Sequence, residues 1–215
     1  MILLHGLGDT NASFTKLGQQ LNLPETACLA VQAPAPLPFD LGGFHWGDDL
    51  LFDPRTGEMD VDTGFSEAMR RVLEDVVRGG LMQRCGYQAR EVLVFGFAQG
   101  GMVGLQLAAE LGGAGEELGG VISIGGVVPS ALPLKALERK STTPVLVCRA
   151  SRGSAVTDSA VSKLQQVFAS VEIKEWARRG DGMPSSREEM LPIMHFLARR
   201  LRSTRGVPAG SIALN

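Results

Sequence analysis

Short apolar runs alternate with stretches of helical spacing along most of this 215-residue chain. The runs at residues 2–4 and 91–97 are short and almost wholly apolar, which is typical of strands buried on both faces. Between such runs, apolar residues recur three and four positions apart, as on one face of a helix. This alternation predicts an α/β protein with a mainly parallel sheet and helices on both faces. The other expected strands are residues 28–32, 121–125, 144–148 and 171–176, and the expected helices are residues 14–21, 65–77, 99–111, 158–170 and 187–203.

The chain shows no internal repeat and no break in this pattern, so we expect one domain over residues 1–203. Residues 204–215 are rich in glycine, proline and small side chains, which predicts a loose C-terminal tail. Residues 33–64 form a long irregular stretch of Pro, Gly, Asp and aromatic residues. Loops of this length inside a compact domain usually bind or cover something, so we expect a functional loop here.

Composition and charge indicate which partners and which compartment to expect. A net charge of −2 gives no reason to expect nucleic acid or an anionic membrane surface as a partner. No apolar run approaches the ~20 residues of a transmembrane segment, and the first residues do not resemble a signal peptide. Three cysteines without paired spacing suit a reducing, cytoplasmic compartment. Cys28 and Cys148 lie in apolar runs and are predicted to be core residues, whereas Cys85 follows a helix and is predicted to be exposed.

The first candidate site is Gly96-Phe97-Ala98-Gln99-Gly100, between an expected strand and an expected helix. This is the context of a nucleophile elbow, G-x-S-x-G, in which a strained turn exposes the middle side chain. Here the middle residue is Ala98, whose methyl group cannot attack a carbonyl. Taken alone, the pattern is equally a glycine-rich turn between a strand and a helix.

A second motif, LHGLGDT at residues 4–10, directly follows the first expected strand. Together with GFAQGG at residues 96–101, it resembles the acyl-protein thioesterase and lysophospholipase-like carboxylesterase family. Gln-Ala-Pro at residues 32–34 and Trp-x-Asp at residues 46–48 fall where that family has similar residues. The resemblance extends from residue 2 to about residue 201 and implies the α/β-hydrolase fold.

The resemblance also implies roles for residues of this chain. The backbone amides of Leu7 and Gln99 would form an oxyanion hole. Apolar residues of the long loop would line an acyl channel, although they could simply tie the loop to the core. These channel residues are Leu37, Phe39, Phe44 and Trp46.

The same resemblance leaves all three catalytic roles vacant. The family's serine position is Ala98, its acid position is Gly153, and its base position is Pro184. Asp158 lies beyond the acid position and is expected to cap the following helix. Because the three triad residues act as a unit, their joint absence predicts loss of the ancestral hydrolysis.

No replacement is evident in the sequence. His45, beside the loop tryptophan, could act as a substitute base, but no serine or cysteine partner can be assigned to it. The aspartates of residues 48–62 do not have EF-hand spacing, and no His or Cys cluster fits zinc. We therefore expect a solvated acidic loop, no metal site and no cofactor.

The LHG motif begins within three residues of Met1, whereas the resembling family usually has one or two strands before it. We therefore expect N-terminal edge strands to be absent from this chain, either because the natural protein lacks them or because the chain is a trimmed form. The first strand, Ile2–Leu4, would then be a bare edge that a partner or the C-terminal tail would cover.

Three functions remain open at this point. In the first hypothesis, the chain is a silent pseudo-hydrolase that binds an acyl or lipid ligand, an acylated peptide or another protein. Alternatively, it is an active carboxylesterase or thioesterase that uses non-standard groups. In a third hypothesis it is a scaffold protein with a collapsed pocket.

Overall fold

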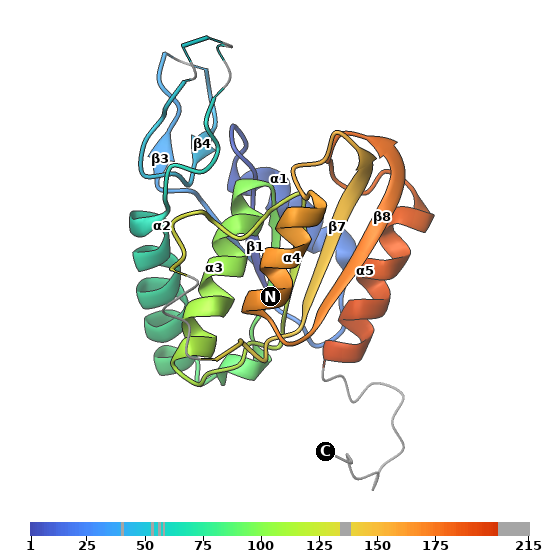
Figure 1. The fold of residues 1–215 in the computed structure, drawn as a ribbon. Coiled ribbons are helices and arrows are strands. Elements are labelled where there is room, and N and C mark those ends of the chain that lie inside the picture. Colours follow the sequence, from blue (N-terminus) through green and yellow to red (C-terminus); the bar gives the residue numbers. More distant parts are fainter. Residues whose placement is uncertain (40, 53, 56, 58, 134–138, 202–215) are drawn as a thin grey trace, which may run out of the picture.

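The computed structural model describes residues 1–39, 41–52, 54–55, 57, 59–133 and 139–201. It contains a six-stranded, wholly parallel sheet in the order β2-β1-β5-β6-β7-β8 (Figure 1). The predicted fold class is confirmed. The predicted domain boundary at residue 203 and the tail at 204–215 lie outside the described residues. The strands are β1 (Ile2–Leu4), β2 (Leu29–Val31), β5 (Leu93–Phe97), β6 (Gly120–Ile124), β7 (Val145–Arg152) and β8 (Val171–Arg179).

The helices lie on both faces of the sheet, and strand residues alternate between the two cores. Val94 and Val121 pack with α2, α3 and α4, whereas Phe95 and Ile122 pack with α1 and α5. This is the two-residue period expected of strands covered on both sides. The helices are α1 (Asn11–Leu21), α2 (Ser66–Arg70), a π-helical η1 (Arg71–Arg84), a short 3₁₀ turn η2 (Ala89–Glu91), α3 (Gln99–Gly113), α4 (Asp158–Val167) and α5 (Arg187–Arg200).

The strand order changes direction at β1. From β1 the chain goes through α1 to β2 on one side, and β5 lies on the other side. In open α/β sheets such a switch point leaves a crevice at the carboxyl ends of the two strands, where ligands bind. The LHGLGDT motif follows β1 and Ala98 follows β5, so the topology brings both motifs to this crevice.

The prediction that Ile2–Leu4 is a bare edge was wrong. β1 pairs on both sides, with β2 and with β5, and its three residues are 0% exposed. Within the described sheet the edge strand is β2, whose Leu29 is 43% exposed. Local sequence gives the strand but not its neighbours, because pairing order depends on contacts distant in the chain.

Two of the three cysteines have the predicted burial, and the exception lies beside the edge strand. Cys148 is buried in β7 and Cys85 is exposed after η1, both as predicted. Cys28 is exposed, which contradicts the prediction of a core residue. It immediately precedes the edge strand β2, so its apolar neighbours do not enclose it.

The helix expected at residues 65–77 continues to Arg84 with π-helical geometry. A Cβ atom at Gly79 would lie 3.0 Å from the Glu74 carbonyl oxygen, and one at Gly80 would lie 3.2 Å from that of Asp75. The wider turn brings carbonyls five residues back against these positions, where glycine relieves the crowding.

The described residues of the range 33–64 project beyond the carboxyl ends of the strands and are called the cap (Figure 1). The cap contains the antiparallel pair β3 (Ala35–Pro36) and β4 (Phe44–His45). It is fastened to the first motif, since the Gly8 amide donates to the Phe44 carbonyl at 2.9 Å and the Phe44 amide to the Asp9 carbonyl at 3.0 Å. The cap therefore lies over the switch point of the sheet.

Candidate functional site

The turn at Ala98 has the geometry of a nucleophile elbow. β5 ends at Phe97, α3 begins at Gln99, and Ala98 between them has φ 48° and ψ −116°. The Ala98 amide donates to the Ile124 carbonyl at 2.8 Å, and the Ala98 carbonyl accepts from Met102 at 3.0 Å. An alanine at positive φ is strained, so tertiary contacts impose this turn.

Glycines on either side make the turn possible. A Cβ atom at Gly96 would collide with the Gly100 carbonyl, and one at Gly100 would collide with the carbonyls of Leu4 and His5. The elbow therefore packs backbone against backbone over the end of β1. The arrangement leaves position 98 half-buried and aims the first amides of α3 at the space beside it.

The loop after β1 supplies the second element of the predicted oxyanion hole. The Gly8 and Asp9 amides are engaged, Gly8 with the cap and Asp9 with the Gly6 carbonyl at 3.2 Å. Within the described residues, the Leu7 amide donates no backbone hydrogen bond. The Gln99 amide is the first of α3 and has no partner within the helix. Among the described residues neither predicted donor therefore has a backbone partner, and their joint role in an oxyanion hole stays a prediction.

A buried polar network holds the cap against this site. The Trp46 indole donates to the His5 carbonyl at 2.7 Å, and the Trp46 amide donates to the Gln99 side chain at 3.1 Å. The Gln99 side chain also donates to the Val61 carbonyl at 3.0 Å. One glutamine therefore joins two points of the cap, Trp46 and Val61, to the start of α3, a role that the sequence did not reveal.

His5 serves this network and is not placed for catalysis. Its Nδ1 lies 2.8 Å from the Gly6 carbonyl, and its Nε2 accepts from the Ala33 amide at 3.1 Å. The ring is fully buried, and desolvation lowers its pKa below the usual value, so it is neutral at pH 7.

The four residues predicted to line an acyl channel differ in their burial and in their contacts. Trp46 is 1% exposed and belongs to the core, which fits the alternative that it ties the loop down. Phe39 is 89% exposed and lies at the outside of the cap. Leu37 lies beside Gly8, and Phe44 is half-buried in β4. Leu37, Phe44 and Trp46 are therefore held at the first motif, whereas Phe39 is not.

The predicted substitute base, His45, is almost fully buried at 5% exposure, and its Nδ1 has no hydrogen-bond partner among the described residues. Desolvation lowers its pKa, so the ring is neutral at pH 7 and able to accept a proton. A base also needs a substrate or nucleophile within reach, and burial limits that access.

The acid and base positions contain no ionisable group. Gly153 follows β7 in an exposed turn with φ 66°, and Pro184 lies in the loop between β8 and α5. Both therefore occupy the expected points of the topology, at the carboxyl end of the sheet. Asp158, expected to cap α4, is instead its first residue and pairs with Arg149 at 2.9 Å, while Thr157 is the cap.

Asp181 joins these two loops directly. Its Oδ1 accepts from the Ala150 amide at 2.9 Å, and its Oδ2 accepts from the Ala155 amide and the Ser154 hydroxyl, each at 2.9 Å. It also packs on Gly125, where a Cβ atom would lie 2.7 Å from that of Asp181. A carboxylate from the base loop thus fastens the acid loop. Sequence reasoning missed it, because a lone Asp in Gly-Asp-Gly carries no local signal of a distant partner.

The base loop is further fixed at the start of α5. The Ser186 side chain caps the helix, since it accepts from the Glu189 amide at 3.2 Å. Glu189 accepts from the Ser185 amide at 2.8 Å and from Arg178 at 3.2 Å. These bonds, the Ser185 amide first, lower the pKa of Glu189. Two carboxylates, from Asp181 and Glu189, therefore shape the loop where a histidine would stand.

A parallel sheet with a strained elbow after β5 and paired loops after β7 and β8 defines an α/β-hydrolase. The family model for Phospholipase/Carboxylesterase matches residues 1–201. The chain belongs to this family.

The chain is similar to an uncharacterised hydrolase of Schizosaccharomyces pombe, with 28% identity over 206 residues that cover 94% of this chain and 83% of the relative. Among solved structures, it is similar to Arabidopsis thaliana SOBER1 (22% identity, TM-score 0.72, covering 94% and 98% of the two chains). It is also similar to Zea mays acyl-protein thioesterase 2 (23% identity, TM-score 0.66, covering 93% and 92%). These structural likenesses show the fold alone. Within the described residues, no helix is long and apolar enough to cross a membrane.

Proposed function

We propose that this chain is a catalytically silent member of its family that binds an acyl ligand through its oxyanion hole. The observation that carries the proposal is the elbow itself. Ala98 has the strained conformation of a nucleophile but offers only a methyl group, and among the described residues no backbone hydrogen bond is donated by the amides of Leu7 and Gln99. Two such amides suit a carboxylate or carbonyl oxygen of a ligand.

The acid and base loops support the absence of turnover. Gly153 and Pro184 cannot orient or transfer a proton, and Asp181 is committed to three hydrogen bonds within the loops. Without a nucleophile and its base, an oxyanion hole alone stabilises a bound oxygen but forms no acyl-enzyme. The thioesterase named among the structural neighbours suggests fatty acyl esters and thioesters as the ligand class to test.

Turnover is tested with a short-chain p-nitrophenyl ester and an acyl thioester, using the purified chain and two variants. We expect no turnover from the chain or from Ala98→Ser, and slow turnover from the triple variant Ala98→Ser, Gly153→Asp, Pro184→His. Gly153 has φ 66°, which aspartate tolerates at a modest cost, so the triple variant should be slow. Fast turnover by the unmodified chain would refute the proposal and direct attention to His45.

Binding is tested by calorimetric titration with a medium-chain fatty acid. Ala98→Asp would place a carboxylate beside the two amides and should weaken binding by at least about tenfold, because it occupies their donors and repels the ligand. Ala98→Ser is the matched control and should bind as the unmodified chain does. Equal affinities for all three proteins would place the ligand elsewhere and would favour a scaffold role.

A further inference from the structure

The carboxylate of Asp181 lies inside the acid loop after β7, although the residue itself belongs to the base loop after β8. Its Oδ1 accepts from the Ala150 amide, and its Oδ2 accepts from the Ala155 amide and the Ser154 hydroxyl, each at 2.9 Å. The Ser154 hydroxyl in turn accepts from the Val156 amide at 3.0 Å. The acid loop is therefore built around a carboxylate that comes from the other loop.

This is the place that the side chain of an aspartate at position 153 would take. An aspartate in a turn commonly accepts from the backbone amide two residues further on. For position 153 that donor is the Ala155 amide, which already donates to Asp181. A Cβ atom at Gly153 would also point towards the base loop, since it would lie 3.8 Å from the Gly180 nitrogen. One carboxylate therefore fits at this point, and Asp181 supplies it.

The same carboxylate lies next to the backbone that holds the elbow. A Cβ atom at Gly125 would lie 3.1 Å from the Asp181 Oδ2. Gly125 follows Ile124, whose carbonyl accepts from the Ala98 amide at 2.8 Å. An ionised aspartate can accept about four hydrogen bonds, and the described residues donate three. Oδ1 therefore has room for one more donor near the elbow.

We propose that Asp181 occupies the place of the triad acid and is the positioning residue for a base on its own loop. In a triad the acid accepts a hydrogen bond from the histidine ring, fixes its orientation and stabilises the imidazolium. Asp181 has both the acceptor and the location for these tasks. A nucleophile and a base alone would then complete the relay. This role rests on the proposed function, because it concerns the same silent site.

The other charged groups around the paired loops are either paired with each other or exposed. Arg178 pairs with Glu189 at 3.2 Å, and Arg149 pairs with Asp158 at 2.9 Å and with Glu175 at 3.1 Å. An exposed arginine lowers the pKa of a nearby imidazole, whereas a carboxylate raises it. The exposed charged residues of these loops are Arg152, Arg179, Arg187 and Glu188.

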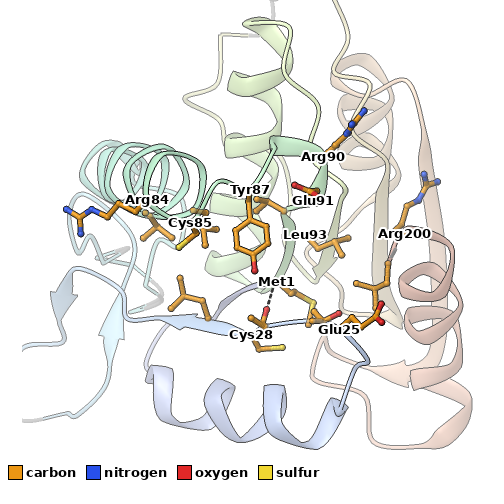
Figure 2. Close-up of a pocket in the computed structure, with 18 of the residues that line it drawn as sticks. Met1, Glu25, Cys28, Arg84, Cys85, Tyr87, Arg90, Glu91, Leu93 and Arg200 are labelled. Atoms are coloured by element: carbon orange, nitrogen blue, oxygen red, sulfur yellow. Dashed lines mark hydrogen bonds between the residues drawn. The ribbon is translucent and has the colours of Figure 1, made fainter. Parts of the chain in front are cut away.

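A cavity of about 710 Å³ lies at the other end of the sheet and is separate from this site (Figure 2). Leu29 and Leu93 line it, and they begin β2 and β5, whereas the paired loops follow the carboxyl ends of β7 and β8. The eight residues of β7 span roughly 26 Å, which exceeds the ~8 Å screening length at physiological salt. The charges around the cavity therefore do not act on Asp181. These residues are Glu25, Asp75, Arg84, Arg90, Glu91 and Arg200.

A first experiment asks whether side chains at positions 153 and 181 compete for one place. Gly153→Asp and Gly153→Asn add side chains of the same shape, both tolerated at positive φ, that differ in charge. At pH 7, Gly153→Asp should lower the equilibrium constant for folding at least about tenfold more than Gly153→Asn does, because two carboxylates that share a site repel each other. With Asp181→Asn in the same chain, the two changes should have equal effects. Urea unfolding followed by circular dichroism measures all four proteins.

A second experiment uses an introduced histidine to detect the free acceptor of Asp181. Pro184→His and Ser185→His place an imidazole at two successive positions of the base loop, before the Ser186 cap. Proton NMR gives its pKa, with the unmodified chain as the reference for the three native histidines. In at least one of the two variants, Asp181→Asn should lower this pKa by about 1, because the carboxylate stabilises the imidazolium. Glu188→Gln is the matched control, since it removes an exposed carboxylate at the start of α5, and it should change the pKa little.

Equal losses of stability from Gly153→Asp and Gly153→Asn in the presence of Asp181 would overturn the proposal. It would also be overturned if the introduced histidine ignored Asp181→Asn at both positions, or responded equally to Glu188→Gln. If a side chain at position 153 prevented folding altogether, the histidine experiment would still decide. Neither experiment uses an ester or an acyl ligand, so turnover by the unmodified chain would refute the proposed silence without changing the place of Asp181.

Discussion

The elbow has Ala98 where a nucleophile is expected, and the paired loops have Gly153 and Pro184 where the acid and the base are expected, but the two regions are built differently. At the elbow, glycine contacts and buried backbone bonds keep the conformation, so only a hydroxyl is missing. In the paired loops, Asp181 makes three bonds that link the loops without any histidine. Backbone packing thus fixes the elbow whatever side chain stands at position 98, whereas side-chain hydrogen bonds fix the paired loops.

The largest expected effect concerns the backbone contacts of the elbow. Gly100→Ala should destabilise the fold by about 3 kcal/mol or more, because the new Cβ atom collides with two carbonyls at the end of β1. Gly113→Ala, in the same helix, has open space around the new atom and should leave stability unchanged or raise it by up to ~1 kcal/mol. Urea unfolding followed by circular dichroism measures both. Similar midpoints for the two variants would show that the elbow is not held by close packing.

The next effect concerns the paired loops. Asp181→Ala should lower the free energy of unfolding by about 2–4 kcal/mol, since it leaves three donors without their charged acceptor. Asp181→Asn retains one carbonyl oxygen and should cost less. The same urea titration gives the values. If the Ala variant unfolds at the wild-type midpoint, other contacts hold the loops together.

A smaller effect of opposite sign is expected at position 98. Ala98→Gly should stabilise the chain by up to ~1 kcal/mol, because relief of the strain at φ 48° exceeds the extra entropy of the unfolded chain. Ala198→Gly, at an exposed position of α5, is the control and should destabilise by about 1 kcal/mol. Destabilisation by both changes would mean that the elbow is unstrained.

The smallest effect is a pH dependence on the elbow side of the site. Burial lowers the pKa of His45 in the folded state, so the unfolded chain binds more protons once the pH falls below about 6.5. Its contribution to stability is therefore complete above about pH 6.5 and is lost as the pH falls towards the folded pKa. His45→Gln should flatten the plot of unfolding free energy against pH between pH 7 and 5. An unchanged slope in His45→Gln would show that His45 is protonated in the folded chain at no cost in free energy.

The strands and their two-sided burial could be predicted from the sequence, because a doubly covered strand must be apolar along its whole length. Residues 2–4 and 91–97 are examples, although Glu91 and Val92 lie before β5. Pairing order could not be predicted, and the edge was therefore assigned to Ile2–Leu4 when β2 occupies it. The wrong prediction that Cys28 is a core residue follows from the same error in the assignment of the edge strand.

At the site, the positions of Ala98, Leu7 and Gln99 followed from glycine motifs whose spacing reflects backbone geometry. The roles of the Gln99 side chain and of Asp181 could not be predicted in this way, because each forms hydrogen bonds with residues more than 25 positions away. The π-helical turns of η1 were also missed. A helical pattern of apolar residues scarcely distinguishes the two kinds of helix over so few turns.

The place of β1 in the sheet has a consequence for the time course of synthesis. Ile2 pairs with Val94, which lies 92 positions further along the chain. At the usual ~5–20 residues per second, β1 waits roughly 5–20 s on the ribosome before its inner neighbour exists. Throughout that interval a wholly apolar strand has only β2 to pair with, so nascent chains of intermediate length should be those that chaperones bind most.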